Sequence, residues 1–141
     1  MELEVRQERA LQTGRRMAIQ HLQKFILDGG LDIGADACPV QHHFAPGVYG
    51  REIRLPAGTV VVGKIHKHAH LNVLSQGRVL VFTEHEGVQE FRAPYTFVST
   101  PGTKRVVYTV EEAVWTCVHR TDKTDLADIE AEVIASDYSE V

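Results

Sequence analysis

Apolar residues recur at helical spacing near both ends of the chain. Between about residues 15 and 27 they repeat every three or four positions, and Gly29-Gly30 ends this pattern. A second helix is predicted at about residues 125–135, after a segment rich in helix-capping side chains. Its apolar residues fall on one face and indicate packing against the rest of the protein: Leu126, Ile129 and Val133.

Between residues 48 and 119 the pattern changes to short runs of β-branched and aromatic residues separated by turn signals. The predicted strands are 48–55, 59–66, 69–75, 78–84, 88–92, 95–99, 105–110 and 113–119. Such short, evenly spaced strands are typical of an antiparallel sandwich or barrel. Residues 28–47 show little periodicity and are predicted to form a loop or arm. The fold class is therefore all-β within one domain, organised as an N-terminal helix and arm (1–47), a barrel (48–119) and a C-terminal helix (120–141).

Composition narrows the class of protein. The chain has 141 residues, of which 43% are hydrophobic and 24% charged, as in one ordinary globular domain. The net charge of −4 argues against nucleic-acid binding, which normally needs a basic excess. No apolar run approaches the length of about 18 residues that a membrane span needs, and the N-terminus lacks a signal-peptide pattern. With only two cysteines, we expect a cytoplasmic protein without disulfides.

Alternating histidines in one predicted strand carry most of the chemistry. Side chains two apart on a strand share a face, so Lys64, His66, His68, His70 and Asn72 are expected to point the same way. Neutral imidazole is a common metal ligand, which makes the three histidines candidate ligands of a divalent transition metal, Zn, Fe, Mn or Ni. The outer two are about 13 Å apart on an ideal strand, so two of them with a ligand from elsewhere are the easier geometry. A metal-free polar pocket and an exposed face remain the alternatives.

The segment resembles the first motif of RmlC-like cupins, and the resemblance covers about residues 48–119. Gly58, His66 and Gly77 fall in the register of that motif, with Lys64 in its first histidine position and His70 in its glutamate position. A shift of two residues restores a histidine pair at His66 and His68, and places Asn72 at the glutamate, but spoils both glycine spacings.

The second cupin motif is matched by Pro101-Gly102, with Arg105 where the family has a histidine. The resemblance implies a jelly-roll barrel with an interior pocket, in which two of the four usual metal positions, Lys64 and Arg105, are cationic. His68 is the expected compensating ligand. The chain also resembles small single-domain cupins that phages often encode. Because cupins usually pair and the 28–47 arm can cover a sheet edge, we expect a homodimer.

Several residues outside the histidine strand are candidates for the pocket. His42 or His43, just before the barrel, is expected to cap the pocket or supply a ligand, unless both are loop residues. His119 closes the pocket if its face of the strand points inward; otherwise that face packs Trp115 on a terminal helix. A further group of cations either binds an anionic group or is scattered over the surface: Arg51, Arg105, Lys64 and Lys104. The expected pocket residues are Lys64, Asn72, Arg105, His119, His43 and Arg51.

Residue content limits the chemistry that such a barrel can perform. Residues 48–119 contain no aspartate, which disfavours an epimerase of the RmlC type and the facial triad of oxoglutarate-dependent oxygenases. A three-histidine centre fits better and leaves positions open for a small-molecule substrate. The leading hypothesis is a metal-binding cupin, an oxygenase or isomerase of a small polar molecule. The alternative is a non-catalytic cupin without metal, which binds or sequesters a small ligand or belongs to a phage particle.

Overall fold

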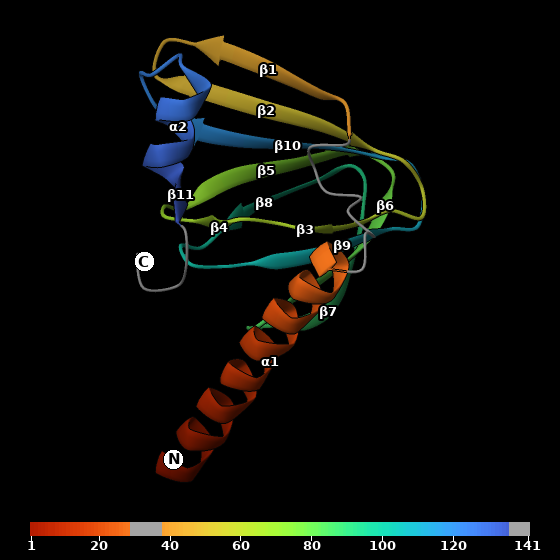
Figure 1. Cartoon of the computed structure of the whole chain (residues 1–141), viewed down its shortest axis with the longest axis vertical. Coiled ribbons are helices and arrows are strands. Elements are labelled where there is room, and N and C mark those ends of the chain that lie inside the picture. The colour runs from red at the N-terminus through yellow and green to blue at the C-terminus, as the bar shows by residue number, and fades with distance from the viewer. Residues whose placement is uncertain (29–37, 136–141) are drawn as a thin grey trace.

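The computed structural model describes residues 1–28 and 38–135, and it confirms an all-β antiparallel fold with flanking helices (Figure 1). The helices are α1 (Glu2–Asp28) and α2 (Leu126–Val133). The strands are β1 (Val40–Ala45), β2 (Val48–Leu55), β3 (Val60–Val62), β4 (Ile65–His66), β5 (His70–Gln76), β6 (Arg78–Thr83), β7 (Gly87–Arg92), β8 (Tyr95–Ser99), β9 (Arg105–Thr109), β10 (Ala113–Arg120) and β11 (Ile134–Ala135).

Two antiparallel sheets form the barrel (Figure 1). One has the strand order β1-β2-β10-β5-β8 and the other the order β3-β9-β6-β7. Alternate residues of both sheets point inward, so that side chains two apart build a common core. That core combines the two sheets: Ile53, Leu55, Leu74 and Trp115 from the first, and Val61, Val79, Val81 and Val107 from the second.

The predicted strands agree closely with the observed ones, with three differences. Residues 134–135, predicted as the end of the second helix, form β11. Residues 59–66 form two separate strands, β3 and β4, rather than one. Residues 40–45, predicted as part of a loop or arm, form β1, which pairs with β2. All but the first residue of β1 are exposed, so this strand is held by backbone pairing and has no buried face to mark it in the sequence. Residues 29–37 of the predicted arm lie outside the described residues.

The turn at Gly77 shows why a glycine is needed between β5 and β6. Its φ of 92° lies in the left-handed region, which other residues rarely adopt. A Cβ atom at this position would also collide with the backbone carbonyl oxygen of Glu112. The glycine that matches the end of the first cupin motif therefore allows two segments of backbone to approach closely.

Helix α1 begins well before the predicted residue 15. Its residues 2–11 are exposed and carry no apolar stripe, so the spacing of apolar residues could not reveal them. The helix projects away from the barrel and contacts it near the turn after β6 (Figure 1). There Arg16 pairs with the buried carboxylate of Glu84, and Arg15 donates to the Glu84 carbonyl oxygen at 3.1 Å. Within the described residues no helix is both long and apolar enough to cross a membrane.

Helix α2 and strand β11 cover one end of the barrel, beside β2 and β10 (Figure 1). Asp125 caps the helix by accepting a hydrogen bond from the Asp128 backbone at 3.1 Å. Ile129 and Val133 are buried against Tyr49, as the helical spacing predicts, whereas Leu126, the third residue of the predicted face, is exposed. Strand β11 then pairs with β4, so the C-terminal segment lies directly beside the strand that carries His66.

Candidate metal centre

Three histidines from three strands meet inside the barrel: His66, His70 and His119. His66 ends β4, His70 begins β5, and His119 lies near the end of β10. Strands β5 and β10 are neighbours in one sheet, and their register, with Cys117 opposite Asn72, brings His119 next to His70. One potential ligand atom from each histidine lies within 4.8 Å of the other two.

The three imidazole rings pack against one another. Their centroids are 4.1 Å apart for His66 and His70, 4.6 Å for His70 and His119, and 5.2 Å for His66 and His119. His70 and His119 are buried, with 5% and 6% of their surface exposed, and His66 is half-buried. The cluster therefore lies within the protein and not on its surface.

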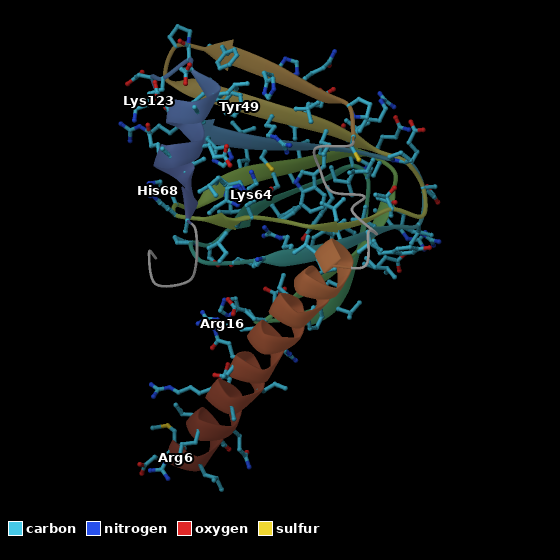
Figure 2. The ribbon with its side chains drawn as sticks, in the orientation of Figure 1. Arg6, Arg16, Tyr49, Lys64, His68 and Lys123 are labelled. Carbon is cyan, nitrogen blue, oxygen red and sulfur yellow. The ribbon has the colours of Figure 1, made fainter. Side chains whose placement is uncertain are left out.

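His68 does not join this cluster, and the expected common face of the three alternating histidines is wrong at this residue. The chain bends at residues 67–68, between the end of β4 and the start of β5. Because alternation holds only within a continuous strand, the bend removes His68 from the inward face. Its side chain is exposed and lies on the outside of the protein beside α2 (Figure 2). The bend equally lets His66 and His70 approach, which a straight strand would prevent.

The ring nitrogens of the cluster fit a metal ion. Nδ1 of His66 and both ring nitrogens of His70 are buried, and none of them makes a hydrogen bond within the described residues. Buried polar atoms normally have a partner, because an unmade hydrogen bond costs about 1–3 kcal/mol. In addition, one ring nitrogen from each of the three histidines lies within 4.8 Å of the other two, and three imidazole nitrogens are a donor set that zinc or another divalent transition metal takes in proteins.

The electrostatic surroundings keep the three histidines neutral, as metal ligands must be. Burial lowers the pKa of His66 to about 3, and the neighbouring imidazoles and arginines add to this effect. Burial likewise lowers the pKa of His119 to about 4. The pKa of His70 is also lowered by burial, although the nearby His68 backbone and Asn72 side chain act in the opposite direction. At neutral pH all three therefore offer a lone pair.

The cluster opens on a cavity of about 510 Å³ between the two sheets. Five of the six expected pocket residues line it: Lys64, Asn72, Arg105, His119 and Arg51. The sixth, His43, does not. It is exposed on β1, with its Nε2 atom 3.4 Å from a carboxylate oxygen of Glu52, and its neighbour His42 lines the cavity instead. Adjacent residues of a strand face opposite sides, so only one of the two can point inward.

Lys64 lies at the outer edge of the cavity and away from the imidazoles. Its Nζ atom is 2.6 Å from a carboxylate oxygen of Glu130 on α2, and both side chains are more than half exposed. Residues 63–64 lie outside any strand. The alternation of side chains along a strand, which predicts that Lys64 faces the same way as the histidines, therefore does not apply. Lys64 thus fastens the covering helix to the barrel.

Tyr49 is a cavity residue that the sequence analysis did not single out. Its hydroxyl group lies 2.6 Å from Nδ1 of His42, and its ring stacks on His119 with the centroids 6.4 Å apart. Burial raises the pKa of Tyr49, so the phenol stays protonated at neutral pH. Alternation along β2 was the available signal, since Tyr49, Arg51 and Ile53 share one face.

Asn72 is a buried polar residue that lines the cavity. Its amide nitrogen donates to Oγ of Ser99 at 2.6 Å, and its carbonyl oxygen accepts from Nε1 of Trp115 at 3.0 Å. With 1% of its surface exposed, Asn72 is fully enclosed and has these two neighbours in place of water. Asn72 therefore positions the Trp115 ring and is not one of the candidate metal ligands.

Comparison with solved structures gives the fold a name. A cupin 2 domain-containing protein from Halorhodospira halophila matches with a TM-score of 0.51 at 15% identity, over 67% of this chain and 75% of that one. An RmlC-like cupin from Methanocaldococcus jannaschii matches with a TM-score of 0.51 at 12% identity, over 60% and 81% of the two chains. Ectoine synthase from P. lautus gives 0.55 at 11% identity, over 66% and 70%. The protein therefore has an RmlC-like cupin fold. No protein-family model and no curated protein matches the sequence.

Proposed function

We propose that this cupin binds one divalent transition metal through His66, His70 and His119 and acts there on a small molecule, as an oxygenase or isomerase. The observation that carries the proposal is the convergence of one ring nitrogen from each of the three histidines, and it is supported by the buried ring nitrogens of His66 and His70 that have no hydrogen-bond partner among the described residues. The cavity beside them has the volume of an ordinary small-molecule site. Ectoine synthase, one of the similar structures, is by its name an enzyme on this fold.

When bound, the metal supplies a Lewis acid with open positions that polarises an oxygen atom of a substrate. The residues of the chain do the remaining work. Helix α2 lines one side of the cavity, with Ile129 and Val133 packed on Tyr49. The hydroxyl group of Tyr49 stays protonated, so it can donate a hydrogen bond to a ligand in the cavity in place of its contact with His42.

Calorimetric titration of chelator-treated protein with Zn²⁺, Mn²⁺, Fe²⁺ and Ni²⁺ tests the proposal. We expect binding of about one ion per chain, and a loss of affinity of more than about 100-fold in His66→Gln, since even an outer hydrogen-bond partner is worth about 10- to 100-fold. His85→Gln is the matched control, because His85 lies by Glu84 at the α1 contact. Absence of binding in the wild-type protein, or equal binding by the two variants, would refute the metal centre.

A metal-free binding protein is the second candidate, and Arg105 favours it. This residue takes the place of a usual metal-binding histidine in the second cupin motif, and it lines the cavity. A barrel that holds its ligand by arginines needs no ion to bind it. The same titration decides between the candidates, because the second requires that none of the four ions binds to the histidine cluster.

A further inference from the structure

Two arginines face the cavity from opposite sheets. Arg51 lies on β2 of the five-stranded sheet, and Arg105 lies on β9 of the four-stranded sheet. Both line the cavity together with the histidine cluster, and both are only partly exposed. The guanidinium carbon of Arg105 lies 5.3 Å from the centre of the Phe97 ring, which supports the side chain from one side.

Neither guanidinium group has an acidic partner among the described residues. Within that part of the chain, the side chains of Arg51 and Arg105 make no hydrogen bond and no ion pair. Of the described residues that line the cavity, only Glu130 carries a carboxylate, and it pairs with Lys64 at the exposed edge. Glu86 acts on Arg105 only as a more distant charge and does not line the cavity. The interior therefore carries two positive charges without compensation.

The two arginines and the three histidines of the cluster line the same cavity. An unpaired charge that is partly removed from water is costly, whereas an arginine paired with a carboxylate through two parallel hydrogen bonds is stable. A metal ion on the histidines would add further positive charge. The cavity thus favours an anion strongly over a neutral or cationic ligand.

One part of the cavity wall is apolar. Ile53, Leu55, Val61, Val107 and Trp115 line it, and the cavity of about 510 Å³ can enclose a hydrocarbon portion as well as an acidic head. Planar carboxylate groups match the fork of a guanidinium group, and an organic acid brings the apolar part that this wall can cover. Charge and lining together specify the ligand class.

We propose that the cavity binds a small organic carboxylate, whose acid group is held by Arg51 and Arg105 and whose apolar part lies against this wall. The inference deepens the proposed function by naming the ligand class, and it rests on the proposed function in placing the ligand in the same cavity. The arginines do not require a metal, so the two claims can fail separately.

Trp115 is the single tryptophan of the chain and lines the cavity, so its fluorescence reports on the ligand. The probes are hexanoate, its neutral analogue hexanamide, and inorganic phosphate, each titrated into the protein as purified and after chelator treatment. We expect saturable binding of hexanoate in both forms, with hexanamide and phosphate roughly 10- to 100-fold weaker, the effect of losing a hydrogen bond to a charged group. Equal binding of the acid and the amide, or tighter binding of phosphate, would overturn the proposed class.

Arginine variants locate the site. Arg51→Gln and Arg105→Gln should each weaken hexanoate roughly 10- to 100-fold. Arg51→Gln should not lower the melting temperature, because Arg51 has no ion pair to lose, and Arg105→Gln should lower it only slightly, because it loses the contact with the Phe97 ring. Arg54→Gln, on the same strand but exposed and paired with Glu112, should bind hexanoate like the wild type. Wild-type affinity in both cavity variants would overturn the inference. Arginine-dependent binding by a protein that takes up no metal would uphold the inference and refute the metal centre.

Discussion

His119 on β10 lies beside His70 on β5, with their ring centroids 4.6 Å apart. The backbone register of β10 and β5 places the two histidines side by side, because Val118, next to His119, pairs with Leu71, next to His70. His66 joins them from β4, a strand that pairs with the C-terminal β11. The histidine cluster therefore depends on strand pairing between segments that are far apart in the sequence.

Asn72 is expected to be important for stability. In Asn72→Ala the Nε1–H group of Trp115 and the hydroxyl group of Ser99 lose their buried partner. An unsatisfied buried group costs about 1–3 kcal/mol, so we expect the free energy of unfolding to fall by about 2–3 kcal/mol in urea titrations. Gln76→Ala, at an exposed position of the same strand, should change it by less than about 0.5 kcal/mol. Equal effects of the two substitutions would show that the Asn72 hydrogen bonds contribute nothing.

The metal-free protein should lose stability as the pH falls below about 6.5. Below that pH the histidines of the unfolded chain bind protons, whereas the folded protein keeps His66 neutral to a pKa of about 3 and His119 to about 4. Protons thus favour the unfolded state, by at most about 1.4 kcal/mol per pH unit for each histidine. Urea titrations between pH 7 and 5.5, above the range in which carboxylates titrate, measure the slope. In a His66→Gln, His119→Gln double variant the slope should be clearly smaller, and an unchanged slope would contradict the assigned pKa shifts.

The contact between α1 and the barrel should depend on Arg16. Glu84 is completely buried, so Arg16→Ala leaves its carboxylate with less compensation and should destabilise the protein by about 2 kcal/mol. Arg6→Ala is the control on the same helix, because Arg6 pairs with Glu2 in full exposure and should contribute less than about 0.5 kcal/mol. Thermal unfolding of the two variants compares them. A melting temperature for Arg16→Ala as high as that of Arg6→Ala would show that the helix contact adds no stability.

The sequence predicts the barrel well because most of its strands carry a recognisable local pattern. Strands β2 and β8 have the predicted bounds, 48–55 and 95–99, since β-branched and aromatic residues fill them and turn residues flank them. Strand β1 and the first half of α1 were not predicted, because nearly all of their residues are exposed. The spacing of apolar residues indicates only those segments that have a buried face.

The candidate site could be predicted only in part. Two of its members, His66 and His70, follow from the histidine strand, and His119 was an open alternative that depended on which way its strand faces. The exclusion of His68 depends on the bend between β4 and β5, which arises where β4 pairs with β11. The residues around His68 give no indication that the preceding strand, β4, pairs with a segment almost 70 residues away. The homodimer, the cytoplasmic location and the phage origin remain predictions.

Elemental analysis of the purified protein tests the central claim most directly, because it asks whether the histidine cluster holds an ion and which histidines do so. The wild-type protein should contain about one transition-metal ion per chain, as a single mononuclear site requires. His119→Gln should lose that ion, whereas His68→Gln should keep it, since His68 is exposed and outside the cluster. The account would be contradicted if the wild-type protein contained no metal even after incubation with Zn²⁺, Fe²⁺, Mn²⁺ or Ni²⁺. It would also be contradicted if the His119→Gln variant kept the full metal content.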